Sequence, residues 1–271
     1  MVLFEYNLTS YPSGNCGLIC FVEYLAATFG RNGMSPSYAQ FDIPDSISDE
    51  LAHHVSVSFL VRTRQQSGLI FFVGSDTSVA ATNQTFIMIE LSEHGVVSKI
   101  KLGDEVERHV LQGLVADGNQ HIIHVSRNYS LLQIQLDNMS KTYTVDYSLP
   151  LIPNLLYVGG MPSHNLRHRR DASSYSSGQF AGTLQDVRLN DMRLSLFHIN
   201  TTDEDGTPAP RIRLPRDLRN VDAGEQSDDV CELQQPCENN ATCQTEFFNK
   251  YRFSTSIYSS SVTEIVKHLT V

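Results

Sequence analysis

The sequence predicts an all-β protein, folded as an antiparallel β-sandwich of the jelly-roll type. Three observations lead to this prediction. Short runs of alternating polar and apolar residues recur at a spacing of about ten residues. Glycine, proline, aspartate and asparagine stand between these runs, where turns favour them. The 3.6-residue periodicity of amphipathic helices is almost absent.

The first predicted elements alternate with period two or form short apolar runs. Residues 21–29 are predicted as a short helix or strand, and Pro44 with the acidic run 46–50 is predicted as a turn. The run GLIFFVG, bounded by glycines, is typical of a buried strand. The predicted strands in this half are residues 38–43, 55–61, 68–74, 85–91 and 96–102.

The strands of the next part are separated by strong turn signals, of which Asp117-Gly118-Asn119 is the clearest. After this turn His121, Ile123 and Val125 fall on one face of a strand, because successive side chains point to opposite faces. The predicted strands here are residues 108–114, 120–127, 131–136 and 141–147.

Residues 154–191 contain two further strands, around Leu155 and around residues 184–189, with side chains that suit a half-buried pleated surface. Gly182 lies inside the second strand, where a glycine marks a bulge or a close backbone approach. The polar residues 163–178 between the strands predict a long exposed loop, and recognition is often located on such loops.

Composition bounds the class of protein. The chain has 271 residues, a hydrophobic fraction of 41% and a net charge of −10, which indicates a globular protein and argues against a nucleic-acid binder. No window is long and apolar enough to span a bilayer. Residues 1–15 contain no Lys or Arg, so they do not resemble a signal peptide. The simplest expectation is a chain that begins inside a longer protein.

Two features predict an extracellular location. Six sequons of the form N-x-[ST] are potential glycosylation sites, at Asn7, Asn83, Asn128, Asn138, Asn200 and Asn240. The five cysteines lie near the ends of the chain, at Cys16, Cys20, Cys231, Cys237 and Cys243. Cysteines clustered at the edges of a cysteine-free domain suggest small disulfide modules that flank a large core.

The composition divides the chain into five parts. The predicted parts are an N-terminal segment (1–34), the β domain (35–200), a linker rich in Asp, Pro, Arg and Gly (201–228), a compact cysteine-bearing module (229–247) and a disordered tail (248–271).

Four segments together resemble the laminin G domain, also called the LNS domain of neurexins. They are GLIFFVG (68–74), ADGNQHIIHVSR (116–127), LLYVGGMP (155–162) and FAGTLQDVRLND (180–191), and the likeness spans about residues 35–200. The resemblance implies two curved antiparallel sheets. The sequence departs from the family pattern at Gln120, where the family has tryptophan, and at Thr183, where it has a cysteine. The family disulfide is therefore absent, and the fold is expected to depend on burial alone.

The cysteine spacing C-x5-C-x5-C near the C-terminus resembles the first half of an EGF-like module. This likeness marks Cys231 and Cys243 as disulfide-forming residues, and it makes Cys20 a candidate for the end of a preceding EGF-like module. Alternating laminin G and EGF-like modules are similar to proteins of the Crumbs, Eyes shut and neurexin type, with the first two preferred.

Many laminin G domains hold one calcium ion at the rim of the sandwich, and calcium requires a cage of oxygen ligands. The resemblance implies Asp76, the carbonyl of Leu102 and Asn128 as ligands here. Thr85 stands where the family often has aspartate. A calcium site and a copy that has lost the ion both stay open, and the threonine favours the loss.

The predicted loop carries Arg167, Arg169 and Arg170 in the pattern R-x-[KR]-R. Three interpretations stay open: a cleavage site for furin-type proteases, a contact for sulfated glycans, or a basic loop with no function of its own.

The predicted function is a non-enzymatic extracellular binding or adhesion module that recognises protein or glycan partners in cell polarity or matrix organisation. One alternative is a carbohydrate-active enzyme of the jelly-roll class, which requires two carboxylates that flank a bond. Glu90 and Glu93 do not meet this requirement, because their spacing places them on opposite faces of a strand. The other alternative is a structural spacer that carries glycans.

Overall fold

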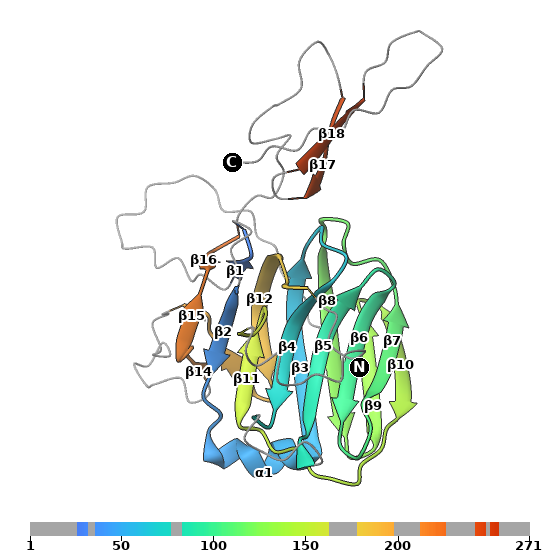
Figure 1. Cartoon of the computed structure of the whole chain (residues 1–271), viewed down its shortest axis with the longest axis vertical. Coiled ribbons are helices and arrows are strands. Elements are labelled where there is room, and N and C mark those ends of the chain that lie inside the picture. The colour runs from blue at the N-terminus through green and yellow to red at the C-terminus, as the bar shows by residue number, and fades with distance from the viewer. Residues whose placement is uncertain are drawn as a thin grey trace.

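The computed structural model describes residues 26–31, 36–76, 83–162, 178–197 and 212–225, and the backbone of residues 242–247 and 250–254. Two β-sheets face each other across one hydrophobic core (Figure 1). This arrangement confirms the predicted antiparallel sandwich. Within these ranges, no helix is long and apolar enough to cross a membrane.

The two sheets are named sheet A and sheet B. Sheet A has the order β10 (Met139–Thr144), β9 (Leu131–Leu136), β8 (Gln120–Asn128), β3 (His54–Arg62), β12 (Gly182–Leu189), β1 (Ala26–Phe29) and β16 (Val221–Ala223), with β13 (Met192–Leu194) beside β12 and β14 (Ile212–Arg213) parallel to β13. Sheet B has the order β15 (Asp217–Arg219), β2 (Tyr38–Phe41), β11 (Leu155–Val158), β4 (Gly68–Gly74), β5 (Phe86–Ser92), β6 (Gly95–Lys101) and β7 (Glu107–Gln112).

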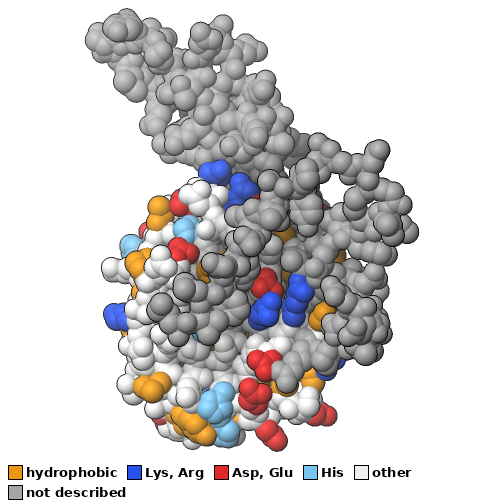
Figure 2. Space-filling model, turned by 180° about the vertical axis from the view of Figure 1, so that it is seen from behind, with side chains coloured by type: hydrophobic (Ala, Val, Ile, Leu, Met, Phe, Trp, Pro, Cys, Tyr) orange, Lys and Arg blue, Asp and Glu red, His pale blue; other side chains and the backbone are white. Residues whose placement is uncertain are grey.

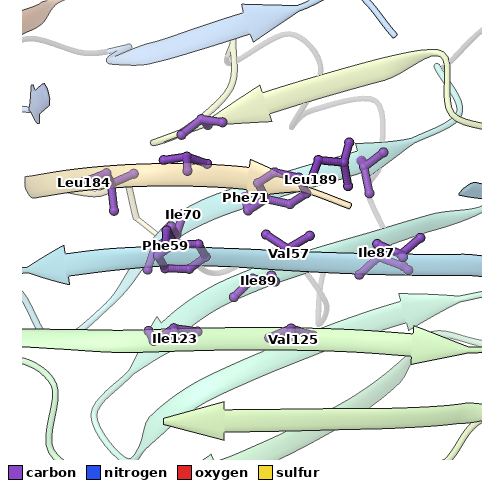
Figure 3. Close-up of a cluster of buried hydrophobic side chains, with 14 of the residues drawn as sticks. Val57, Phe59, Ile70, Phe71, Ile87, Ile89, Ile123, Val125, Leu184 and Leu189 are labelled. Carbon is purple, nitrogen blue, oxygen red and sulfur yellow. The ribbon is translucent and has the colours of Figure 1, made fainter. Parts of the chain in front are cut away.

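The core lies between the sheets and follows from the period-two patterns. Along β3 every second side chain is buried, so Val57 and Phe59 point inward while their neighbours face outward. Figure 3 shows these two side chains beside Ile123 of sheet A and near Phe71 and Ile89 of sheet B. Burying one such side chain stabilises a fold by about 1.5–3 kcal/mol. The alternation predicted from the sequence is thus the pattern that assembles the core.

One helix, α1 (Asp45–His53), replaces the turn that was predicted at residues 46–50, so that prediction was wrong. The helical periodicity of its apolar residues is weak, because the helix has nine residues and buries one side chain, Leu51. Pro44 precedes the helix, and Asp45 adds negative charge to its first turn, where the helix dipole favours it. A short helix with one buried residue has no recurring apolar positions by which the sequence could reveal it.

The sandwich extends beyond the predicted domain range of 35–200 in both directions. Within the predicted N-terminal segment, β1 pairs with β12 in sheet A. Within the predicted linker, β15 pairs with β2 of sheet B and β16 pairs with β1 of sheet A. Both predicted boundaries were therefore wrong. The later strands have polar sequences because they lie at sheet edges and stay half exposed.

Hydrogen bonds occupy the positions where the family pattern has a cysteine and a tryptophan. Thr28 and Thr183 face each other in the β1–β12 register, with their hydroxyl oxygens 3.2 Å apart, and Thr28 also donates to the carbonyl of Gly224 (3.0 Å). Gln120 donates to Gln185 (3.1 Å) on the surface. A buried hydroxyl pair therefore joins the strands, in addition to the expected burial.

Gly182 confirms the predicted close backbone approach. Its φ is +156°, and a Cβ atom there would lie 2.6 Å from the carbonyl oxygen of Arg62. The predicted bulge lies further along the strand, where the register with β3 shifts between Gln185 and Arg188. Asp186 has a φ of +49° at this shift, which is typical of a bulge.

At the C-terminal end, β17 (Thr242–Phe247) pairs antiparallel with β18 (Lys250–Ser254). The second strand lies within the tail that was predicted to be disordered from residue 248, so the prediction was wrong for residues 250–254. The likeness of residues 229–247 to an EGF-like module concerns residues that mostly lie outside the described ranges.

Candidate ligand-binding rim

One end of the sandwich, named the α1 rim, joins α1 to the strand ends of both sheets. Residues 147–154 cross this rim and connect its parts through backbone hydrogen bonds. The N–H of Leu151 donates to the carbonyl of Ala52 in α1 (3.3 Å), and the N–H of Asn154 donates to the carbonyl of Gly74 at the end of β4 (3.0 Å). These hydrogen bonds fix the parts of the rim relative to one another. The predicted calcium ligands lie at this rim.

Thr85, at the position where the family often has aspartate, is fully buried at this rim. Its hydroxyl oxygen accepts a hydrogen bond from the N–H of Ile152 (2.8 Å). Its carbonyl oxygen accepts the N–H of Ser75 (2.8 Å). The oxygens of Thr85 thus complete the packing of the rim instead of presenting a carboxylate to an ion.

The carbonyl of Leu102, predicted as a calcium ligand, already accepts two backbone hydrogen bonds. The donors are the N–H groups of Ser148 (2.9 Å) and Leu149 (2.7 Å). A carbonyl oxygen has two lone pairs, so both are used. A calcium ion at this oxygen would have to displace one of these hydrogen bonds.

The other two predicted ligands belong to different sheets. Asp76 follows β4 of sheet B and is half-buried, whereas Asn128 ends β8 of sheet A and is exposed. In the described part of the chain, no three His, Cys, Asp or Glu side chains are grouped so that they can hold a metal. Calcium prefers six to eight oxygen ligands, and the described residues of this rim do not by themselves supply such a set. The calcium site stays a prediction.

The α1 rim also carries a cluster of aromatic rings that the sequence did not predict, named the rim cluster: His53, His54, Tyr129 and Tyr147. The ring of Tyr129 stacks on His53 at 5.4 Å between centroids, and meets His54 edge-on at 5.1 Å and Tyr147 edge-on at 5.7 Å. His53 also hydrogen-bonds through Nδ1 to the hydroxyl of Tyr147. Tyr129 is 49% exposed and has a φ of +50°. The doublet His53-His54 was the available sequence signal.

Arg127, a buried residue of β8, supports the rim cluster. Its side chain is 2% exposed, and its guanidinium donates to the carbonyls of Leu51 and Ala52 (3.0 Å each) and of Tyr129 (3.2 Å). Burial lowers the pKa of Arg127, and the neighbouring Tyr147 opposes this effect. The guanidinium Cζ lies 5.4 Å from the centre of the Tyr147 ring. One buried cation thus ties the last turn of α1 to the backbone of the exposed tyrosine.

At the opposite end of β8, His121 lies between two aspartates. His121 contacts Asp137 through Nδ1 (2.8 Å) and Asp117 through Nε2 (3.0 Å). Burial alone would lower the pKa of His121, but the hydrogen bonds and charges of Asp137 and Asp117 outweigh it and raise this pKa. His121 lies on the same face of β8 as the buried Ile123 and Val125, as the period-two pattern predicted.

Three predicted glycosylation sites lie on the described surface. Asn83, Asn128 and Asn138 are all exposed. Asn128 directly precedes Tyr129 at the α1 rim, whereas Asn138 lies in the turn between β9 and β10. The predicted sites at Asn7, Asn200 and Asn240 lie outside the described residues. A glycan on Asn128 would share the rim with the rim cluster.

The basic loop with Arg167, Arg169 and Arg170 also lies outside the described residues, and so does Cys231. The backbone of Cys243 belongs to β17, and its side chain is not described.

Glu90 and Glu93, the two carboxylates considered for catalysis, lie in different environments. Glu90 is buried and pairs with Lys99 at 2.8 Å. Glu93 is exposed in the turn between β5 and β6. Glu90 and Glu93 therefore do not form a pair of carboxylates that could flank a bond. Figure 2 shows the face turned away from the viewer of Figure 1, where acidic, basic, hydrophobic and histidine side chains are scattered over the described surface and one group of histidine atoms lies at the lower end.

The comparisons with known proteins agree with this fold. Residues 61–192 match the family model of the laminin G domain. The laminin α1 chain of mouse, in its domains LG4-5, has a similar structure with a TM-score of 0.57 and 19% identity, over 76% of this chain and 48% of that one. The LG1-3 region of the laminin α2 chain gives a TM-score of 0.53 at 19% identity, over 76% of this chain and 35% of that one. These two likenesses show the fold.

Sequence relatives include two Crumbs proteins. Protein crumbs homolog 1 of Mus musculus is 27% identical over 236 residues, which is 84% of this chain and 14% of that protein. Protein crumbs homolog 2 of Homo sapiens is 30% identical over 227 residues, again 84% of this chain and 14% of that protein. The laminin subunit alpha of Drosophila melanogaster is 25% identical over 167 residues, or 57% of this chain and 4% of that protein. The chain thus spans a small part of each relative.

Proposed function

We propose that the chain contains a laminin G domain and is a non-enzymatic binding module of an extracellular protein, which recognises protein or glycan partners. The match of residues 61–192 to the laminin G family model supports this. The described carboxylates support this class over a glycosidase, because the carboxylate of Glu90 is buried against Lys99. The exposed sequons at Asn83, Asn128 and Asn138 support an extracellular location, and we expect them to carry glycans.

The rim cluster is the observation that carries the proposed binding site. Tyr129 is 49% exposed, yet its ring packs on His53 and His54 and its backbone carbonyl is held by Arg127. An aromatic ring that is fixed before binding loses little conformational entropy when a ligand covers it. Such a ring offers an apolar face together with a hydroxyl, which suits a sugar ring or an apolar peptide side chain.

The relatives support a wider setting. We propose that this module belongs to a Crumbs- or Eyes shut-like protein that acts in cell polarity or matrix organisation, and that Cys231 and Cys243 form disulfides of an adjoining EGF-like module. The similarity to two Crumbs proteins over most of this chain supports this setting. The chain spans 14% of either relative, so the activity of a whole Crumbs protein is part of the proposal.

Binding to a glycan array and to an extracellular-matrix extract tests the rim site. The secreted full chain is compared with Tyr129→Ala and with the control Ile122→Ala, which removes a side chain that is 44% exposed on the outer face of sheet A. We expect Tyr129→Ala to weaken binding at least tenfold and the control to bind like the parent. Equal binding by both variants would show that the rim is not the binding site.

The basic loop is a second candidate contact, for sulfated glycans. Guanidinium groups bind sulfate through paired, charge-assisted hydrogen bonds. Retention of the full chain on a heparin column is compared with that of Arg167→Ala, Arg169→Ala and Arg170→Ala combined. Loss of retention in the triple variant supports the contact, and a parent that is not retained rules it out. A cut after Arg170, seen by mass spectrometry of the secreted chain, would instead assign the loop to a furin-type protease.

A further inference from the structure

Asn128, the asparagine of one predicted sequon, lies among exposed side chains on the outer face of sheet A, at the end that meets the α1 rim. In the strand register Asn128 is opposite His54 of β3 on one side and Leu131 of β9 on the other. All three residues are exposed, and Leu131 keeps 53% of its surface. They occupy the alternate, unburied positions of their strands, so their side chains share one face.

The register places His54 and Leu131 within reach of a group attached to Asn128. Side chains directly opposite each other in an antiparallel pair have Cβ atoms about 4.5–5.5 Å apart. The N–H of Tyr129 donates to the carbonyl of His53 (3.0 Å), so the neighbouring pair His54–Asn128 is of the type without hydrogen bonds, in which the side chains lie closest. A group on the Asn128 side chain therefore leaves the surface between an imidazole and an apolar side chain.

The imidazole of His54 also connects Asn128 to the rim cluster. Its ring meets the ring of Tyr129 edge-on at 5.1 Å. Tyr129 directly follows Asn128, begins the two-residue turn between β8 and β9, and is 49% exposed. Arg127 donates to the carbonyl of Tyr129 (3.2 Å) and thereby holds this turn. The sequon asparagine is thus flanked by two exposed side chains with apolar surface, Tyr129 and Leu131.

We propose that an N-linked glycan on Asn128 lies over Leu131 and the exposed ring of Tyr129, and thereby limits access to the rim cluster. The sequon Asn-Tyr-Ser at residues 128–130 includes an exposed hairpin turn, which a glycosylating enzyme can reach. In this reaction the Asn128 side-chain nitrogen bonds to C1 of N-acetylglucosamine, and the bond from C1 to the lipid diphosphate of the oligosaccharide donor breaks. The proton of the nitrogen is released with the diphosphate.

The first sugar ring suits the surface beside Asn128. A pyranose ring has an apolar face of C–H groups next to its hydroxyls, and tyrosine offers an apolar ring with a polar tip. Covering the exposed surface of Leu131 removes apolar area from water, which stabilises the covered arrangement. Thr144, the register neighbour of Leu131 on its other side, has a small side chain and leaves this contact open.

An attached glycan competes with any free ligand of the rim. A group linked to the site has an effective concentration in the millimolar range, because it cannot diffuse away. A free ligand has to displace the glycan in order to reach Tyr129. This competition rests on the proposed rim site, whereas the contacts of the glycan with Tyr129 and Leu131 do not.

Nitration of Tyr129 by tetranitromethane measures the cover directly, without a rim ligand. The secreted full chain is compared with Asn128→Gln and Ser130→Ala, each of which removes the sequon, and glycopeptide mass spectrometry gives the occupancy of Asn128. We expect Asn128 to be occupied in the parent and Tyr129 to be nitrated severalfold faster in both variants. The control Asn138→Gln, which removes the sequon in the turn between β9 and β10, should leave the rate unchanged.

Three results of this experiment would overturn the proposal. They are a parent whose Asn128 carries no glycan, equal nitration rates in the parent and both variants, and a faster rate in Asn128→Gln alone, which would assign the effect to the substituted side chain. Ser130→Ala keeps the turn, since Ser130 contributes its carbonyl to a backbone hydrogen bond with the N–H of Val145 (2.8 Å).

A double-mutant cycle tests the contact with Leu131. Ser130→Ala should lower the thermal midpoint by a few degrees in the parent and by less in the Leu131→Ala background, where the glycan has no side chain to cover. Equal losses in both backgrounds would refute this contact.

Binding of a free ligand separates this inference from the proposed function. A glycan-array ligand whose binding depends on Tyr129 should bind Ser130→Ala severalfold more tightly than the parent. Equal binding together with equal nitration would overturn the glycan cover and leave the rim site standing. Faster nitration in Ser130→Ala without any ligand for either protein would support the cover and refute the proposed rim site.

Discussion

At the scale of single residues, Thr28 and Thr183 form a buried hydroxyl pair between β1 and β12, and Thr183 stands where the family pattern has one cysteine. The two threonines are 155 positions apart in the sequence and directly opposite each other in the β1–β12 register, with their hydroxyl oxygens 3.2 Å apart. Side chains that close in an antiparallel pair meet the distance requirement of a disulfide. Two cysteines at these positions would therefore lie within reach of each other.

We predict that Thr28→Cys combined with Thr183→Cys forms a disulfide and stabilises the oxidised protein by about 2–4 kcal/mol, because the cross-link closes a long loop of the unfolded chain. Urea denaturation of the oxidised and reduced double variant measures this difference. The parent and Thr183→Cys alone are the controls, because the five native cysteines respond to oxidation equally in all three proteins. The double variant should gain stability on oxidation beyond the change seen in both controls. A double variant whose thiols stay free would contradict the prediction.

The two histidines of β8 respond to pH in opposite directions. The pKa of His121 is raised, because its hydrogen bonds and charges from Asp137 and Asp117 outweigh its burial. Its contribution to stability is complete below the unfolded pKa of about 6.5 and is lost as the pH rises through the folded pKa. Burial lowers the pKa of His124. Its contribution is present above about pH 6.5 and declines as the pH falls from there towards the folded pKa.

We predict that His121→Asn removes the loss of stability that the parent shows as the pH rises from about 6.5 through the folded pKa of His121. His124→Gln should keep that loss and remove the decline on the acid side. The free energy of unfolding in urea, measured at several pH values for the parent and both variants, checks this. Parallel pH profiles of His121→Asn and the parent above about pH 6.5 would show that the two acids do not hold a charged His121.

At the scale of elements, α1 depends on a residue from another strand. Helix ends leave their last carbonyls without intrahelical donors. Arg127 of β8 supplies donors to the carbonyls of Leu51 and Ala52, and its charge lies where the helix dipole favours a cation. This explains how a short helix with one buried side chain stays in place. It also positions the neighbouring rim cluster.

We predict that Arg127→Met destabilises the protein by about 2–3 kcal/mol, because three carbonyls, one of them fully buried, lose charge-assisted hydrogen bonds. Arg127→Lys should recover part of this loss, since lysine restores the charge without the planar fork. Arg188→Met, which removes a half-exposed cation beside Asp186 (3.0 Å), is the control and should change stability by less than about 0.5 kcal/mol. Equal effects of the variants at positions 127 and 188 would contradict the role of Arg127.

At the scale of the whole molecule, the α1 rim suggests a domain that is stable without calcium. The oxygens of Thr85 and Leu102 already accept backbone hydrogen bonds. We predict that millimolar calcium leaves the thermal midpoint unchanged relative to a chelator. A calcium site filled at a hundred times its Kd would add about 2.7 kcal/mol. A midpoint raised by several degrees in calcium, and not in magnesium, would show that the rim rearranges to hold the ion.

The sequence predicted most strands because burial repeats every second residue in β3 and β8, whose alternation needs no partner to be recognised. It missed α1, whose single buried residue gives no period, and it misplaced the domain boundaries, because β1 and β16 are short and pair with residues far away in the chain. The rim cluster was missed for a related reason. His53 and Tyr129 are distant in sequence and become neighbours only when β3 pairs with β8.

The sequence by itself thus determined the sandwich and the laminin G resemblance, because period-two burial and turn residues are local properties of the chain. Only the tertiary structure decided which groups meet. It placed donors on the carbonyl of Leu102, a cation beneath the exposed ring of Tyr129, and the imidazole of His54 beside the sequon asparagine Asn128. Contacts of this kind join residues far apart in sequence, and the register of the strands fixes them.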